Sequence, residues 1–321
     1  KTDSQYGDPV GNFDCTHRGT FFSIFVVKQQ VGMEINFGGM VMELAIRNLS
    51  CGYGKRRVVD SISLSINAGE VIGLLGANGC GKTTLIKTIL GLLPFLGGEV
   101  LLEGKNIQYW TSAQIARVVG YIPQMHTPPF PFQVLDVVLM GRTAHIKPFA
   151  SPSLKDVKIA EQALEMLDIT YLRDRIYTEI SGGERQLVLI ARALTQEPKI
   201  LIMDEPTASL DFGNQIKVLS HVKQLAGLNI AVLMSCHFPE HAFLYTNRVV
   251  LLNEGRILHS GTPDETITPE RLKKLYGVDV DIITVKNRMN QELQVCVPSR
   301  SLAAEDKYYQ SMERRNQYAL A

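Results

Sequence analysis

The chain has 321 residues, of which 45% are hydrophobic and 20% are charged, as in an ordinary globular protein of one large or two modest domains. Its 33 Lys and Arg residues almost balance its 32 Asp and Glu residues, and a net charge of +1 argues against a generally basic surface for nucleic acid. We therefore expect no nucleic-acid partner.

Membrane spans and cysteine frameworks are also disfavoured. The longest apolar runs, such as residues 21–27, fall far short of the roughly 20 residues that cross a bilayer, and this run lacks the basic leader of a signal peptide. The five cysteines are widely spaced and include no C-x-x-C pair, which fits neither a zinc site nor a disulfide framework. We expect a reducing cytoplasmic compartment.

Residues 1–41 differ from the rest of the chain, because they are polar apart from one short aromatic run and begin on Lys1. We expect an N-terminal extension that is disordered or foreign to the native chain, with the folded domain beginning at Met42. A short ordered N-terminal strand is the alternative.

The next segments read as strands. Serines alternate with apolar residues over 61–67, a pattern typical of a half-buried antiparallel strand, and residues 99–103 form a second candidate. Residues 71–75, 200–203 and 230–234 are instead almost wholly apolar. Such runs, alternating with helices, predict an α/β fold whose parallel sheet is covered on both faces.

A mostly helical insert is expected over about 124–179. Prolines interrupt the chain near its start, and Ser153 precedes an amphipathic helix whose apolar residues recur from Val157 to Leu167. A short helix is also expected over 269–276, whereas the pattern fades after about Asp281 and residues 301–321 read as a loose polar tail.

A glycine-rich turn follows the first apolar run and fits the pattern G-x-x-x-x-G-K-[ST] from Gly76 to Thr83. Its glycines let backbone N–H groups close around a phosphate at a helix N-terminus. Lys82 is expected to reach the β- and γ-phosphates, and the Thr83 hydroxyl to bind Mg²⁺. Within this loop we interpret Cys80 as a tolerated small residue rather than a redox switch, although it would make nucleotide binding sensitive to thiol reagents.

A second apolar run, 200–203, delivers Asp204 and Glu205 to its end. There Asp204 can hold the Mg²⁺ shell and Glu205 can take a proton from an attacking water. Taken alone, the two acids are as readily explained as helix caps.

Residues 181–186 read Ser-Gly-Gly-Glu-Arg-Gln, and Ser181 and Glu184 have the spacing of a capping box. A well-capped helix is the plain interpretation. However, Gly182 and Gly183 weaken the start of a helix by roughly 1 kcal/mol each while baring N–H groups to an anion. This predicts a second phosphate-binding helix end, which has no evident partner within one subunit.

Together these motifs resemble the nucleotide-binding subunit of an ATP-binding cassette (ABC) transporter. The resemblance covers about residues 42–261 and matches seven family motifs in order: the adenine-stacking aromatic (Tyr53), Walker A (Gly76–Thr83), the Q-loop (Gln124), the signature (Ser181–Arg185), Walker B (Ile200–Glu205), the D-loop (Asp211) and the switch histidine (His237). It implies a P-loop NTPase core with an antiparallel β subdomain and a helical subdomain. The ATPase domain would span 42–265, with a C-terminal extension over 266–321.

The resemblance also implies the site and its cofactors, ATP and Mg²⁺. Glu205 would act as general base, with His237 and Gln124 as further catalytic residues, and Thr83, Gln124 and Asp204 would hold the metal. Nucleotide contacts would come from Tyr53, Gly76, Asn78, Gly79, Cys80, Gly81, Lys82, Thr83, Thr84, Ser181, Gly182, Gly183 and Asp211. In this family two copies pair head to tail, each nucleotide lying between Walker A of one and the signature of the other.

Residues 134–142 and 181–193 are similar to the ATPases of iron-siderophore, haem and cobalamin importers. That likeness implies transmembrane permease subunits, an external substrate-binding protein as an indirect partner, and a peripheral location on the cytoplasmic face of the plasma membrane. A molybdate or tungstate importer and a soluble ABC ATPase of metal-cluster assembly are the alternatives. The chain departs from the wider family at Phe238, where an acidic residue is common after the switch histidine.

Overall fold

A computed structural model describes residues 42–299 except 125–129 and 148. Its strands are β1 (Met42–Tyr53), β2 (Arg56–Asn67), β3 (Val71–Leu75), β4 (Phe95–Leu102), β5 (Lys105–Asn106), β6 (Val119–Ile122), β7 (Ile200–Met203), β8 (Ala231–Cys236), β9 (Arg248–Asn253), β10 (Arg256–Gly261), β11 (Val280–Lys286) and β12 (Glu292–Pro298). Its α-helices are α2 (Lys82–Ile89), α3 (Ser112–Val118), α4 (Val134–Leu139), α5 (Leu154–Met166), α6 (Gly182–Leu194), α7 (Phe212–Gly227), α8 (Pro239–Tyr245), α9 (Pro263–Thr266) and α10 (Pro269–Tyr276). The expected N-terminal extension and the tail 301–321 lie outside the described residues.

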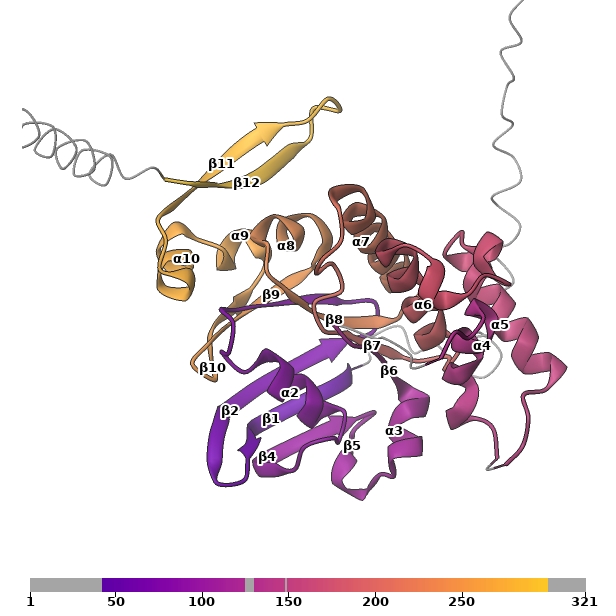
Figure 1. Ribbon diagram of the computed structural model, residues 1–321. Coiled ribbons are helices and arrows are strands. Elements are labelled where there is room, and N and C mark those ends of the chain that lie inside the picture. Colours follow the sequence, from indigo (N-terminus) through magenta and orange to yellow (C-terminus); the bar gives the residue numbers. More distant parts are fainter. Residues whose placement is uncertain (1–41, 125–129, 148, 300–321) are drawn as a thin grey trace, which may run out of the picture. The chain divides into compact units, whose positions relative to one another are not determined.

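The central sheet has the order β10-β9-β3-β8-β7-β6, with parallel pairs from β9 to β6 and an antiparallel edge strand β10. The three apolar runs form β3, β7 and β8, as predicted, and every residue of these strands is buried. Figure 1 shows α7 and α8 over one face of this sheet and α2 with the antiparallel sheet over the other.

Each face of the central sheet supports its own apolar core, because successive strand residues point to opposite sides. In β3, Ile72 and Leu74 pack with α2 and the antiparallel sheet, whereas Val71 and Leu75 pack with α6, α7 and α10. The same alternation recurs in β7 and β8. The α/β fold class predicted from the sequence is thereby confirmed.

The antiparallel sheet has the order β2-β1-β4-β5. The alternating stretch 61–67 forms the second half of β2, and the candidate strand at 99–103 forms the end of β4.

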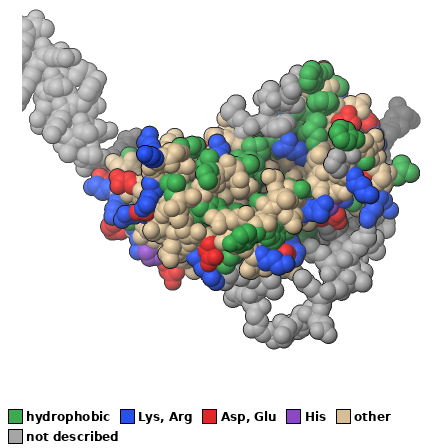
Figure 2. All heavy atoms as spheres, turned by 90° about the horizontal axis from the view of Figure 1, so that it is seen from below, with side chains coloured by type: hydrophobic (Ala, Val, Ile, Leu, Met, Phe, Trp, Pro, Cys, Tyr) green, Lys and Arg blue, Asp and Glu red, His purple; other side chains and the backbone are tan. Residues whose placement is uncertain are grey.

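Figure 2 shows basic and acidic side chains interspersed on the face of the molecule seen from below.

The insert carries α4, α5 and short 3₁₀ turns, and Ser153 caps α5 as predicted through a capping box with Asp156. A buried guanidinium fixes α5 to the end of α6: Arg142 Nε donates to Asp156 Oδ1 at 2.9 Å, and its Nη1 donates to the Thr195 carbonyl at 2.6 Å. Hydrogen bonds from Ser153, followed by that from Arg142, lower the pKa of Asp156 to about 2.

The C-terminal extension is more ordered than the sequence pattern indicated. Helix α10 forms over Pro269–Tyr276 as expected, but the residues after Asp281 also form a hairpin, β11–β12, where we predicted fading structure. Only one face of the hairpin packs on the core, through residues that include Ile282 and Cys296, so its sequence carries a weak apolar signal. Among the described helices, none is long and apolar enough to cross a membrane.

Candidate nucleotide site

The phosphate loop connects β3 to α2. Gly79 and Gly81 have φ angles of 78° and 111°, a region that side-chain-bearing residues rarely adopt, so the turn depends on glycine there. Lys82 is buried, with 5% of its surface exposed, and its Nζ donates to the carbonyls of Gly76 at 2.7 Å and Ala77 at 3.2 Å. The phosphate loop therefore wraps around the ammonium group of Lys82, the first residue of α2.

The Cys80 side chain lies inside this loop. It is buried beside Gly76, where a Cβ would collide with the Cys80 Sγ. Burial raises the pKa of the Cys80 thiol. Less of it is therefore thiolate at neutral pH, which lowers the reactivity toward thiol reagents that the sequence suggested.

A hydroxyl and a carboxylate meet beside the loop. Thr83 Oγ1 donates to Asp204 Oδ2 at 2.9 Å, and Asp204 is buried at the end of β7. Ser235, which sequence reasoning missed, donates to the other carboxylate oxygen at 2.9 Å and accepts from the Glu205 amide at 2.7 Å. Hydroxyl and carboxylate oxygens are the donors that Mg²⁺ prefers, so Thr83 and Asp204 fit that ion.

Three neighbouring strands bring the predicted catalytic residues together. Gln124 follows β6, Glu205 follows β7 and His237 follows β8, and these strands are adjacent and parallel in the sheet. Glu205 Oε1 lies 2.5 Å from His237 Nε2, and Glu205 Oε2 accepts a hydrogen bond from Gln124 Nε2. Glu205 has a φ of 51°, a left-handed conformation that costs a non-glycine residue energy and is found at functional sites.

The predicted second anion site begins α6. Ser181 Oγ accepts from the Glu184 amide at 3.3 Å, and Glu184 Oε2 accepts from the Ser181 amide at 2.8 Å, so the capping box forms. Hydrogen bonds from the backbone and then the side chain of Ser181 to the carboxylate lower the pKa of Glu184, and Tyr171 donates a further one at 3.0 Å. Ser181 and Gly182 are exposed to solvent.

Asp211 caps the neighbouring helix α7 and holds the Asn214 side chain, whose Nδ2 donates to Asp211 Oδ2 at 2.8 Å. The Asn214 carboxamide lies directly against Gly183, where a Cβ would collide with it. The starts of α6 and α7 are therefore in contact through Gly183. Sequence reasoning missed Asn214, although its spacing of three from an N-cap aspartate was a usable signal.

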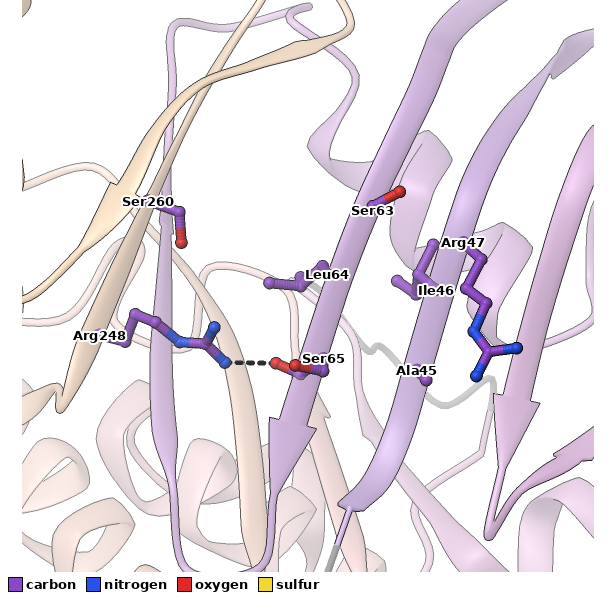
Figure 3. A pocket seen from close by; sticks show the side chains of 8 residues that line it. All are labelled: Ala45, Ile46, Arg47, Ser63, Leu64, Ser65, Arg248 and Ser260. Atoms are coloured by element: carbon purple, nitrogen blue, oxygen red, sulfur yellow. Dashed lines mark hydrogen bonds between the residues drawn. The ribbon is translucent and has the colours of Figure 1, made fainter. Parts of the chain in front are cut away.

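The predicted site residues fall into separate groups. Within residues 42–299 as described, no hydrogen bond or ion pair joins the start of α6 to the phosphate loop. Tyr53 ends β1 opposite Arg56 and is half exposed. A shallow hollow of about 320 Å³ lies elsewhere, between Ser63, Ser65, Arg248 and Ser260, and Figure 3 shows that none of the predicted residues lines it.

Comparison with known proteins shows which family the chain resembles. Residues 59–208 match the family model described as ABC transporter. An uncharacterised ABC transporter ATP-binding protein of Haemophilus influenzae is 42% identical over 78% of the chain and 95% of its own length. A probable iron chelatin transport ATP-binding protein of Helicobacter pylori is 35% identical (77% and 98%), and a molybdate import ATP-binding protein of H. influenzae is 36% identical (73% and 87%).

Among solved structures, an inward-facing, putative metal-chelate type ABC transporter matches with a TM-score of 0.73 and 33% identity, over 82% of this chain and 99% of that one. The strand-end cluster of Gln124, Glu205 and His237, the phosphate loop and these similarities agree. The chain belongs to the ATP-binding proteins of the ABC transporter family.

Proposed function

We propose that this chain is the ATP-hydrolysing subunit that powers a membrane importer of metal chelates, of the iron-siderophore, haem or cobalamin class. The observation that carries the ATPase assignment is the strand-end cluster, in which Glu205 contacts both His237 and Gln124 beside the Thr83–Asp204 pair. A base, two oxygen donors for a metal and a phosphate loop are the parts that ATP hydrolysis requires.

The residues divide this work. The amides of the phosphate loop and Lys82 bind the phosphates, and Mg²⁺, held by Thr83 and Asp204 with Gln124, neutralises the phosphate charge when bound. Glu205 accepts a proton from the attacking water, and His237 orients the carboxylate that does so. Each Glu205 oxygen has one contact in the structure, so each keeps a second acceptor site that can face the water.

A second copy is the proposed partner at the exposed start of α6. Ser181 and Gly182 face solvent there, and the helix N-terminus offers N–H groups to an anion. Head-to-tail pairing would bring these groups to the γ-phosphate held by Lys82 of the other copy. ATP would then close the pair, and hydrolysis would open it.

The insert is the proposed contact with transmembrane permease subunits, at the cytoplasmic face of the plasma membrane. Large apolar side chains are exposed on it, including Phe130 at 61%, Met140 at 40% and Leu154 at 90%. Exposed apolar side chains of this size are typical of a protein interface when they lie together. The cargo class is supported by the similarity to the metal-chelate type transporter and the iron chelatin relative.

Solubilising membranes that carry the tagged chain, and reconstituting the recovered complex, tests this proposal. We expect a polytopic permease to co-purify, and ATP hydrolysis in proteoliposomes to rise when a binding protein loaded with a ferric siderophore, haem or cobalamin is added. A response to molybdate or tungstate alone would replace the cargo assignment, because the molybdate relative is equally similar. Recovery without any membrane protein would favour metal-cluster assembly instead.

A matched pair of variants separates the permease contact from folding. Met140→Lys changes an exposed residue of the insert and should abolish co-purification while ATP binding is retained. Tyr109→Lys changes a side chain that is 87% exposed outside the insert and should leave both properties unchanged.

A further inference from the structure

Strand β2 departs from regular pairing beside the phosphate loop. One residue of β1, Ser50, faces two residues of β2, Asp60 and Ser61, and Ser61 has a φ of 52°. Such a bulge turns the local backbone away from its partner strand. As a result, the Asp60 amide donates to the Gly255 carbonyl at 2.9 Å, outside the β1–β2 ladder.

Gly255 belongs to the turn between β9 and β10 and connects β2 to the phosphate loop. Its own amide donates to the Cys80 carbonyl at 3.0 Å. Glu254 and Gly255 have φ angles of 47° and 76°, as a two-residue hairpin turn requires, and a Cβ on Gly255 would collide with the Val58 carbonyl. The turn is therefore wedged between β2 and the loop.

The Asp60 carboxylate joins the two hairpins through Arg256 of β10 and is held from its own strand by Arg57. Arg57 Nη1 donates to Asp60 Oδ1 and Arg256 Nη2 donates to Asp60 Oδ2, each at 2.6 Å. The Asp60 side chain is only 21% exposed, although both arginines reach into solvent. Hydrogen bonds from Arg256 and then Arg57 lower the pKa of Asp60, so the Asp60 carboxylate is charged at neutral pH.

The β1–β2 hairpin also carries Tyr53, the residue expected to stack on adenine, at the end of β1. We propose that Asp60 is a positioning residue that sets the adenine-side hairpin at a fixed place relative to the phosphate loop, and so contributes to affinity for the base but not for the phosphates. This inference rests on the ATP-binding part of the proposed function, and Asp60 would act through Tyr53.

Calorimetric titration of the full chain with ATP and with inorganic tripolyphosphate tests it. We expect Asp60→Ala to weaken ATP binding by about 3- to 10-fold, because the ion pair with Arg256 that joins the two hairpins is lost, and tripolyphosphate binding by less than about 2-fold. Asp60→Asn, which keeps one acceptor oxygen, should fall between. Glu99→Ala is the matched control, because it removes a carboxylate–arginine pair with Arg47 at 3.1 Å on the same sheet, and it should change neither affinity.

A double-mutant cycle makes the test specific to position. In a Tyr53→Ala background, Asp60→Ala should cause no further loss of ATP affinity, because the hairpin then has no adenine contact to place. Equal losses for ATP and tripolyphosphate, or additive effects of the two substitutions, would overturn the inference while leaving the ATPase assignment intact. A wild-type chain that binds neither ligand would overturn the proposed function itself.

Discussion

Replacing Glu205 by glutamine is the sharpest test of the proposed chemistry, because the substitution preserves shape and removes the base. Glutamine retains one acceptor oxygen but presents an NH₂ group in place of the other. In the structure the two oxygens contact His237 and Gln124, so either the Gln124 carboxamide turns over to accept from the new NH₂ group or one contact is lost. The substitution should therefore lower the free energy of unfolding by no more than about 1 kcal/mol.

The effect on catalysis should be much larger than the effect on folding. Loss of a general base slows a reaction by roughly 10²- to 10⁴-fold, which corresponds to about 2.7 to 5.4 kcal/mol in the activation free energy. ATP affinity should stay within about 3-fold of wild type, because the phosphates are bound by the loop and not by Glu205.

Phosphate release under saturating ATP measures turnover, and titration with a fluorescent ATP analogue measures binding. Glu165→Gln, a change of the same kind on the exposed face of α5, is the control and should leave turnover unchanged. Turnover of Glu205→Gln within about 3-fold of wild type would refute the assignment of Glu205 as the base.

Three further predictions concern stability. Gly182→Ala should raise the free energy of unfolding by about 0.5–1 kcal/mol through helix propensity, whereas Gly183→Ala should gain nothing or lower it, because its methyl group meets Asn214; urea denaturation compares the two, and equal gains would contradict the contact. Because the pKa of Asp156 in the folded chain is about 2, below its usual 3.8, its stabilising effect is complete above about pH 4 and is lost as the pH falls toward 2; Asp156→Asn should flatten this part of the stability curve, and an unchanged slope would argue against it. Tyr276→Phe should change the free energy of unfolding by no more than about 1 kcal/mol, because the hydroxyl is buried and its contact with the Gly76 backbone falls outside standard hydrogen-bond geometry; a loss above about 1 kcal/mol in urea denaturation would show that this contact is a full hydrogen bond.

The sequence predicted the strands that are buried on both faces better than those that are not. Residues 71–75 and 200–203 read correctly because a central parallel strand needs apolar residues at every position. The hairpin β11–β12 packs on the core through one face only, and residues 283–286 of β11 are all exposed although Ile283 and Val285 are apolar, so no clean alternation marked the strand.

The site residues were likewise predicted only in part from the sequence. The resemblance to the ABC family implied that Gln124, Glu205 and His237 each serve the nucleotide, and the structure accounts for their meeting by the adjacency of β6, β7 and β8. Sequence spacing carries no strand order, so the direct contacts of Glu205 were not predictable. The contribution of Ser235 and the bulge at Asp60 were missed for a related reason: both depend on which backbone groups tertiary contacts leave unpaired.

The position of Lys82 has a consequence for how the loop takes up its ligand. Its ammonium has three N–H donors, of which two donate to carbonyls within the loop, so the third can donate to an incoming phosphate oxygen. That hydrogen bond would be the strongest of the three, because an anionic oxygen is a better acceptor than a neutral carbonyl. Selectivity at this position therefore depends on the charge of the ligand, and other oxyanions should compete for the loop while neutral sugars and bases should not.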